Sequence, residues 1–156
     1  MFYYKVENRK SPIQGEGLYT LDDIKKGSII FYWGSDQDRI INESTYLKKR
    51  KDVSDNIFQK TSGRWVHNKF LHCKEWGPDC YMNHSYSPNI LYYCGIGFAK
   101  KDIKKNEELF INFQYLLSDK DSACFTDIET NRQVIGLDND ECLKESSKEL
   151  ILLLNK

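Results

Sequence analysis

One short stretch, residues 83–89, holds side chains that can do chemistry, and it reads Asn-His-Ser-Tyr-Ser-Pro-Asn. The amide of Asn83 can both donate and accept hydrogen bonds, and the imidazole of His84 carries its proton on the nitrogen that its partner dictates. Pro88 fixes its own φ and favours an extended backbone at Ser87, so the stretch predicts a rigid turn. The same residue types are common in plain surface turns. By itself, the stretch leaves a binding loop and an ordinary turn as alternatives.

Further stretches on either side narrow this choice. They are Gly-Glu-Gly-Leu-Tyr-Thr at 15–20, Ile-Lys-Lys-Gly-Ser-Ile-Ile at 24–30, Phe-Tyr-Trp-Gly at 31–34, and Phe-Ala-Lys-Lys-Asp-Ile-Lys-Lys-Asn-Glu-Glu-Leu-Phe-Ile-Asn-Phe at 98–113. Taken in this order with residues 83–89, they resemble the motifs of the SET-domain family of protein lysine methyltransferases. The family's motifs are G-x-G, I-x-x-G-x-x-I, aromatic-Tyr-x-Gly, N-H-S-x-x-P-N and A-x-x-D-I-x-x-G-E-E-L-x-x-x-Y. The resemblance covers about residues 11 to 115.

The resemblance implies a mainly β, or β-rich α+β, architecture: the SET fold of small curved sheets with a helical insert and a C-terminal helix. In that fold the signature loop, here residues 83–89, and the closing segment, here residues 98–113, form a pseudoknot. This would bring Asn83 and His84 beside the last strand. We expect a SET domain over residues 1–118, with a variable insert at about 35–75 that helps to select the substrate peptide. We expect residues 119–156 to form a C-terminal extension that packs on or beside this domain.

The resemblance also implies a cofactor, S-adenosylmethionine, and roles for single residues. The residues expected to bind the cofactor are Glu16, Gly17, Asn83 and His84. Those expected at the catalytic centre or along the lysine channel are Tyr32, Tyr92, Phe113 and Tyr115. Methyl transfer needs a neutral amine, whereas a free lysine has a pKa near 10.4. A narrow, ring-walled channel lowers that pKa by desolvation and holds the reacting atoms in line.

Two positions depart from the family pattern. Asn106 stands where the family usually has Gly, which is a mild change because Asn tolerates left-handed backbone geometry. Phe113 stands where the family has its catalytic tyrosine and brings no hydroxyl. Tyr115 would share the strand face of Phe113, but about 6–7 Å further along the backbone. The sequence therefore indicates a slow methyltransferase, a methyltransferase in which the Tyr115 hydroxyl compensates, or a SET-fold binding module.

The family's frequent trailing cysteine motif, which binds zinc and helps to close the active site, is absent here. The segment after Phe113 is therefore the candidate for covering the cofactor. A separate zinc hypothesis starts from four residues that lie within a short span: His67, His72, Cys73 and Cys80. Their spacing lacks the paired cysteine and histidine clips of common zinc sites, so we expect no metal.

Composition excludes several other classes of protein. The 156 residues include 23 basic and 23 acidic side chains, so no global field favours nucleic acid, and only residues 48–51 form a local basic run. For that reason we expect no direct nucleic-acid binding, and we expect no membrane association because no run approaches about 20 apolar residues. Five irregularly spaced cysteines fit a reducing compartment, so we expect an intracellular protein of the nucleus or cytoplasm whose partner is a protein or peptide carrying a lysine.

Apolar periodicity and turn residues predict the elements that must hold these side chains. The expected strands are 2–7, 29–33, 56–60, 63–67, 69–73, 90–94, 97–99 and 109–113, with a loop over 8–17. A helix is expected from Asn42 or Glu43 to Lys51, and a second from about Asp140 to Leu154, capped by residues 138–140. Residues 123–137 predict a hairpin around Glu129-Thr130-Asn131.

Three functions remain in contention. The first is transfer of a methyl group from S-adenosylmethionine to a lysine amine of a protein, and the intact cofactor-side motifs favour it. The second is a non-catalytic SET module that binds a peptide or partner, and Phe113 favours it. The third is a small zinc-dependent protein that uses residues 67–80.

Overall fold

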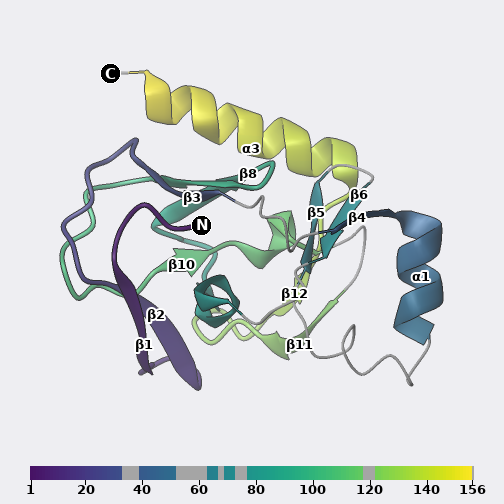
Figure 1. Ribbon diagram of the computed structural model, residues 1–156, viewed down its shortest axis with the longest axis horizontal. Helices are drawn as coiled ribbons and strands as arrows, with labels where there is room; N and C mark the ends of the chain where they lie inside the picture. Colours follow the sequence, from purple (N-terminus) through teal and green to yellow (C-terminus); the bar gives the residue numbers. More distant parts are fainter. Residues whose placement is uncertain (33–38, 52–62, 67–68, 73–76, 118–121, 156) are drawn as a thin grey trace.

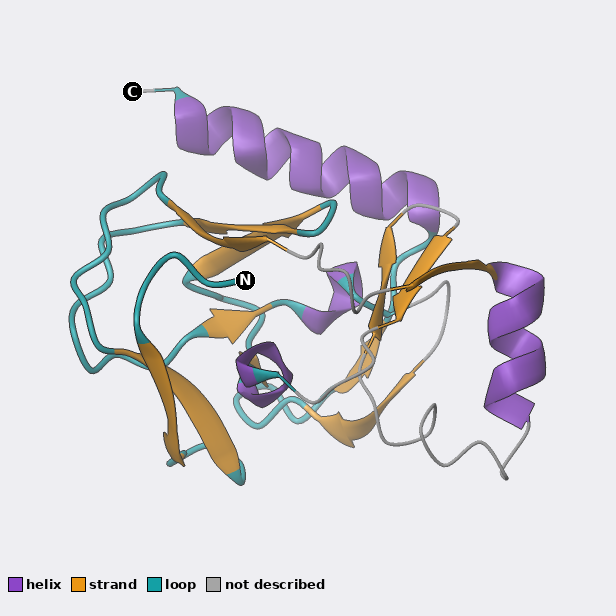
Figure 2. Cartoon of the chain, viewed as in Figure 1, coloured by secondary structure: helices purple, strands orange, loops and turns teal. Residues whose placement is uncertain are grey.

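A computed structural model describes residues 1–32, 39–51, 63–66, 69–72, 77–117 and 122–155. The strands are short and form several small sheets, as Figure 2 shows by colour. The two α-helices of this part of the chain lie at the edges of the molecule, with α3 across the top of Figure 1 and α1 at its right. The strand-rich character expected from the sequence is therefore present.

Short elements follow one another along the whole chain. The strands are β1 (Val6–Lys10), β2 (Glu16–Thr20), β3 (Ile29–Tyr32), β4 (Arg39–Asn42), β5 (Gly63–Val66), β6 (Lys69–His72), β7 (Asn83–His84), β8 (Ile90–Tyr93), β9 (Ile96–Ala99), β10 (Phe110–Ile111), β11 (Ser122–Thr126) and β12 (Gln133–Ile135). The helices are α1 (Glu43–Lys51), the 3-10 turns η1 (Pro78–Tyr81) and η2 (Phe113–Tyr115), and α3 (Asn139–Leu154).

The first hairpin differs from the sequence prediction. Strand β1 begins at Val6 and pairs antiparallel with β2 as far as Lys10↔Glu16, so the predicted loop over 8–17 shrinks to residues 11–15. The prediction failed because two-stranded antiparallel pairs can keep one face in water, so a polar segment is compatible with a strand. This pairing positions residues 14–17, the opening glycine segment, at the start of β2.

The central sheet has the order β3-β9-β8 and carries much of the apolar core. Phe31 pairs with Gly97, and a Cβ atom at Gly97 would lie 2.3 Å from the Phe31 ring, so only glycine fits there. The predicted hairpin between β8 and β9 is confirmed, with Cys94 and Gly95 at φ of 46° and 89° in its turn. Helix α3 runs along β8 (Figure 1).

A parallel pair of two-residue strands joins distant parts of the chain. Strand β7 pairs with β10 in the register Phe110↔Asn83 and Ile111↔His84. The predicted strand over 109–113 is thus shorter than expected, because the chain turns into η2 at Phe113. The pseudoknot arrangement implied by the family resemblance, with Asn83 and His84 beside the last strand, is present.

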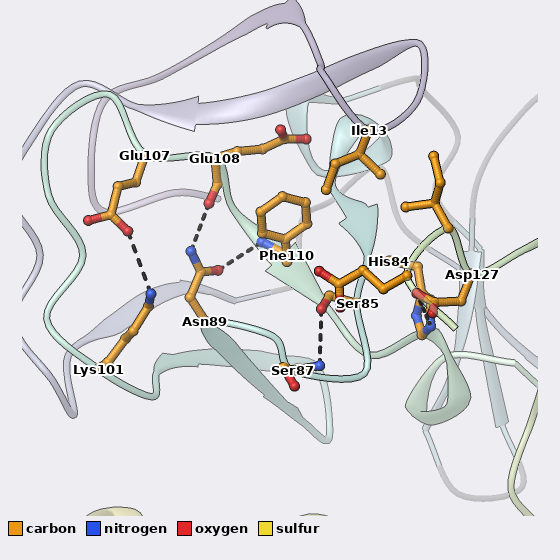
Figure 3. Close-up of a pocket in the computed structure, with 12 residues that line it drawn as sticks. Ile13, His84, Ser85, Ser87, Asn89, Lys101, Glu107, Glu108, Phe110 and Asp127 are labelled. Carbon is orange, nitrogen blue, oxygen red and sulfur yellow. Dashed lines mark hydrogen bonds and ion pairs between the residues drawn. The ribbon is translucent and has the colours of Figure 1, made fainter. Parts of the chain in front are cut away.

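The Asn89 side chain fastens this crossing. Its Nδ2 donates to the Glu108 carbonyl at 2.7 Å, and its Oδ1 accepts from the Phe110 N–H at 2.8 Å (Figure 3). Asn89 is buried, with 5% of its surface exposed. An amide suits this position because it matches one backbone acceptor and one backbone donor at once.

A second three-stranded sheet, ordered β4-β6-β5, lies within the predicted insert. Helix α1 follows β4 in the chain. The predicted helix start is confirmed, since the Asn42 Oδ1 accepts from the Thr45 N–H at 2.9 Å. The strands predicted at 63–67 and 69–73 are present over Gly63–Val66 and Lys69–His72. The strand predicted at 56–60 lies outside the described residues.

After η2 the chain forms the hairpin β11-β12 and then α3, both as predicted. Asp138 caps α3, because its side chain accepts from the Glu141 N–H at 2.8 Å. Asn106, the residue that replaces the family glycine, has a φ of 71°, which agrees with the left-handed geometry anticipated for it. None of the helices in the described segments is long and apolar enough to cross a bilayer.

The Asn89 bridge yields a stability prediction. Asn89→Ala should lower the free energy of unfolding by about 2 kcal/mol or more, because it leaves a buried carbonyl and an N–H without partners. Denaturant unfolding followed by circular dichroism measures this change. Asn155→Ala, at an exposed position beyond α3, is the matched control and should stay within about 0.5 kcal/mol of the parent. Equal stability of the two variants would contradict the role of the bridge.

Candidate active site

The Asn83 side chain links the signature loop to the opening glycine segment. Its Nδ2 lies 3.2 Å from the Gln14 carbonyl, 3.2 Å from the Glu16 carbonyl and 2.7 Å from Glu108 Oε1. These partners come from two segments, residues 14–16 and Glu108, that are far apart in sequence from each other and from Asn83. The amide therefore fixes the approach of the opening segment to the parallel strand pair.

Glu108 is the acceptor at the centre of this junction. Its Oε2 accepts from the Ser11 hydroxyl and from the Tyr19 hydroxyl, each at 3.0 Å, while Oε1 accepts from Asn83. A Cβ atom at Gly17 would lie 2.0 Å from Glu108 Oε1, so the carboxylate occupies the space that glycine leaves open. Burial, and then the hydrogen bond and charge of Glu108, raise the pKa of Tyr19.

His84 points to the other side of the same strand pair. Its Nδ1 accepts from the Phe113 N–H at 3.1 Å, so the neutral ring carries its proton on Nε2. The Nε2 atom is buried, has no hydrogen-bond partner, and lies 3.8 Å from Asp127 Oδ2. Burial lowers the pKa of His84, although the charge of Asp127 and the Ile111 carbonyl act in the opposite direction.

Phe113 lies in an aromatic cluster rather than at the end of a strand. Its ring centroid is 5.7 Å from that of His84 and 5.5 Å from that of Phe125, in edge-to-face arrangements. Tyr86 packs edge-on against His84 at 4.6 Å. Edge-to-face pairs at these distances hold rings in defined orientations. Phe125 comes from β11, so the C-terminal extension contributes directly to the surroundings of Phe113.

Asp127 follows β11 and is 3% exposed. Its Oδ1 accepts from the Thr130 N–H at 2.8 Å and from the Thr130 hydroxyl at 2.6 Å. Burial alone would raise the pKa of Asp127, but these two hydrogen bonds and the nearby His84 lower it below its usual value. The side chain is therefore a carboxylate whose Oδ1 is fixed by Thr130 and whose Oδ2 faces His84.

A cavity of about 350 Å³ lies where the signature loop, the closing segment and the C-terminal hairpin meet (Figure 3). Its walls are Ile13, His84, Ser85, Ser87, Asn89, Lys101, Glu107, Glu108, Phe110, Asp127, Ile128 and Glu129. Four carboxylate side chains and one ammonium group face it, together with apolar surface. Cavities of this size hold small molecules, and this lining favours a ligand that combines apolar and cationic parts.

Another hollow, of about 520 Å³, shares Ile13 and Ile128 with the first. It lies between the opening segment, through Gln14, and the C-terminal hairpin, through Phe125. The hairpin thus faces the opening segment across both spaces. This is the position in which a segment after Phe113 can cover a bound ligand.

The structure brings the four predicted cofactor residues together. Glu16 and Gly17 meet Asn83 and Glu108, and His84 lies next to Asn83 on the parallel pair, although only His84 of the four lines the 350 Å³ cavity. Their role in binding a cofactor stays a prediction. Sequence reasoning missed Glu108 and Asp127. Glu108 lies in the quoted closing motif and could have been found there, whereas Asp127 is an acidic residue before a predicted turn, a position that does not indicate a functional role.

The predicted channel residues are more dispersed. In the central sheet Tyr32 lies opposite Ile96 and Tyr92 opposite Gly97, so their side chains leave opposite faces. Tyr92 is 2% exposed, whereas Tyr32 is half-buried beside the N-terminal residue, Met1. The two tyrosines therefore do not wall one channel from the same side of this sheet.

Tyr115 points away from Phe113. Its hydroxyl donates to Glu149 Oε1 on α3 at 2.7 Å, and burial together with Glu149 raises its pKa. The expected shared strand face is wrong, because residues 113–115 form a 3-10 turn, in which successive side chains fan out around the axis. The Tyr115 hydroxyl is thus engaged elsewhere and does not stand in for the one that Phe113 lacks.

Of the four residues of the zinc hypothesis, only His72 and Cys80 belong to the described part of the chain. His67 and Cys73 lie outside the described residues. Among the segments that the structure describes, no three His, Cys, Asp or Glu side chains gather as metal ligands would.

Glu108 gives a prediction about stability and ionisation together. Glu108→Ala should lower the free energy of unfolding by about 3 kcal/mol or more, because three donors lose their acceptor. Glu108→Gln should cost less, since the Ser11 and Tyr19 hydroxyls can turn and accept from the new amide.

In Glu108→Gln the pKa of Tyr19 should fall, because the negative charge that opposes its ionisation is gone; carbon-detected NMR of the ring across alkaline pH measures this pKa. Glu107→Gln is the neighbouring control, and an unchanged Tyr19 in Glu108→Gln would contradict the contact.

Comparison with known proteins places this geometry in a family. The family model for the SET domain matches residues 15–114. Among solved structures, the chain resembles an active polycomb repressive complex 2 in the basal state, with 21% identity and a TM-score of 0.54 over 70% of this chain and 15% of the other. It also resembles a chain of the Chaetomium thermophilum polycomb repressive complex 2, with 23% identity and a TM-score of 0.54 over 70% of this chain and 15% of the other. A third similar structure is an active polycomb repressive complex 2 in the stimulated state, with 22% identity and a TM-score of 0.58 over 86% of this chain and 18% of the other.

The chain thus spans less than a fifth of the length of these three solved chains, and at these identities the likeness shows the fold alone. A comparison with curated protein sequences gave no match. The expected mainly β SET fold is confirmed by the small sheets, the crossing at β7 and β10, and these structural neighbours. Since the family model covers most of its residues, the chain belongs to the SET-domain family.

Proposed function

We propose that the protein is an S-adenosylmethionine-dependent protein lysine methyltransferase. SET domains are typical of lysine methyltransferases, and such enzymes generally use this cofactor. The observation that supports the proposal is the parallel pair β7 and β10, which holds Asn83 and His84 between the opening glycine segment and Phe113. The motifs that make up a cofactor site in this family are thus in contact with one another here.

The residues present fit the cofactor. S-adenosylmethionine carries a cationic sulfonium and an ammonium group together with an aromatic base, and the 350 Å³ cavity offers carboxylates beside the apolar side chains of Ile13 and Phe110. His84, which lines this cavity, would contact the cofactor, and Asn83 with the backbone of Glu16 and Gly17 would act beside it through their junction with Glu108. When bound, the cofactor supplies a methyl group activated by the positive sulfur. The chain's own residues would orient it and exclude water.

The lysine amine must arrive neutral and in line with the methyl group. We propose Tyr32, which is half-buried, as a wall of the lysine channel, with Phe113 beside the reacting atoms. Tyr92, buried on the opposite face of the sheet, would support the wall by packing. A channel of this kind favours the neutral amine by desolvation, as an adjacent positive sulfur also does.

In this proposal the C-terminal extension, residues 119–156, covers the bound cofactor. Phe125 and Asp127 reach Phe113 and His84, and α3 contacts η2 and β8. The substrate would be a protein or peptide carrying a lysine, histone or non-histone, met inside the cell in the nucleus or cytoplasm. The insert around α1 would help to select it.

A second candidate is a SET module that binds a partner without catalysis. Two observations favour it: Phe113 has no hydroxyl, and the Tyr115 hydroxyl is bonded to Glu149. Loss of one preorganised polar group at a reacting centre commonly costs about a hundredfold or more in rate. The two candidates therefore differ in turnover rather than in cofactor binding.

Calorimetry with S-adenosylmethionine tests the shared part of the proposal. The natural chain should bind it, and Asn83→Ala should weaken binding by about tenfold or more through loss of the junction with Glu16 and Glu108. Lys144→Ala, on the exposed surface of α3, is the control and should bind like the parent. Absence of binding by the folded parent would refute both candidates' use of the cofactor.

Methyl transfer from labelled S-adenosylmethionine to a panel of proteins separates the two candidates. The natural chain should label lysine slowly, and Phe113→Tyr should raise kcat by about a hundredfold by restoring a polar group at the reacting centre. Phe125→Tyr, in the same aromatic cluster, controls for a hydroxyl added elsewhere. Activity that arises only in Phe113→Tyr would favour the binding module, and no activity in either protein despite cofactor binding would refute the methyltransferase.

A further inference from the structure

One buried polar atom of the signature loop is not used by the contacts described so far. His84 Nε2 has no hydrogen-bond partner in the structure, and the side chain is only 2% exposed. A buried donor without a partner costs about 1–3 kcal/mol, so such an atom requires an explanation. Asp127 Oδ2, on the C-terminal extension, lies 3.8 Å from it.

The hydrogen bonds of the ring determine which proton form faces Asp127. The Phe113 N–H donates to Nδ1, which therefore carries no hydrogen, and the remaining ring proton must sit on Nε2. An N–H dipole directed at a carboxylate is favourable, whereas the opposite tautomer would present a lone pair to it. At 3.8 Å the contact is electrostatic rather than a direct hydrogen bond.

The carboxylate is oriented before anything binds. Thr130 holds Oδ1 through its N–H and its hydroxyl, and the backbone of Asp127 bonds to Arg132 and Asn131 at 2.8 Å each. These contacts leave Oδ2 as the oxygen directed at the imidazole. The turn between β11 and β12 is thus built around this one side chain.

The other charged groups around the cavity are engaged or peripheral. Glu108 uses both oxygens on Ser11, Tyr19 and Asn83. Glu107 accepts from the Lys104 N–H and lies 3.8 Å from the Lys101 ammonium. Glu129 is exposed at the turn. Asp127 is therefore the carboxylate that faces the ring of His84.

We propose that Asp127 is a positioning residue for the active site: it fixes the Nε2–H tautomer of His84 and, through the Nδ1 contact, the backbone at Phe113. The effect runs from the C-terminal extension to the signature loop and then to the residue in the place of the catalytic tyrosine. The extension thereby orients the site as well as covering it. The link to catalysis rests on the proposed function, whereas the contact itself does not.

NMR of the ligand-free protein tests the contact without reference to activity. Long-range ¹H–¹⁵N spectra should show His84 as the Nε2–H tautomer, which needs no variant. In Asp127→Asn the pKa of His84 should fall, because the carboxylate that favours its protonation is gone, and the ring nitrogen shifts should move. Glu129→Gln removes the same charge from the same turn and should leave the His84 ring nearly unchanged. An Nδ1–H tautomer in the parent, or equal effects of the two variants, would overturn the proposal.

Calorimetry then tests the consequence for binding. Asp127→Asn should weaken S-adenosylmethionine by about tenfold, the loss expected for one charge-assisted contact, while unfolding curves establish that the variant is folded. An altered His84 with unchanged affinity would overturn the positioning role and leave the proposed function standing. If the parent does not bind the cofactor at all, the proposed function fails, and the tautomer and pKa of His84 still decide whether Asp127 acts on the ring.

Discussion

The parallel pairing of Asn83 and His84 with Phe110 and Ile111 is the constraint on which the rest of the site depends. Only two residues of each strand take part, so side chains must hold the crossing together. Asn89 does so on the backbone, and Glu108 does so by collecting donors from the opening segment. With Asn89 and Glu108 buried, such a polar network specifies one arrangement, because any slip leaves several groups without partners.

The same crossing divides the site into two chemically distinct sides. The Asn83 side is polar, since the amide donates to the Glu108 carboxylate, which also accepts from the hydroxyls of Ser11 and Tyr19. The His84 side is aromatic, with Phe113 and Phe125 against the ring, and it ends in one buried donor facing Asp127. The first side gives rigidity, and the second is where the C-terminal extension meets the site.

Sequence reasoning reached the fold through the family resemblance, and its element-by-element predictions held where the signal is local. Asn106 kept the left-handed turn of the glycine that it replaces, and Asp138 and Asn42 capped helices where capping residues were expected. It failed where a three-dimensional partner decides the outcome. Residues 8–10 look like a loop until β2 pairs with them, and the departure of the chain into a 3-10 turn at Phe113 leaves no periodic trace.

The candidate site was predictable to the same extent. The motifs identified Asn83, His84 and the opening glycine segment, which do meet. They did not identify Asp127, because a lone acidic residue before a turn has no distinguishing pattern in one sequence. Pairing register likewise decided that Tyr32 and Tyr92 leave opposite faces, and strand alternation within each separate segment does not contain that information.

Glu149 has a consequence for how this chain can be handled. One carboxylate oxygen accepts from the Tyr115 hydroxyl, and the other lies 2.6 Å from the Lys100 ammonium, so α3 is tethered at once to the turn after Phe113 and to the end of β9. Trimming the chain ahead of this glutamate would free the buried phenol of Tyr115, two positions after Phe113. Affinity tags placed beyond Leu154 leave that tether intact, which makes the far end of α3 the gentler place for them.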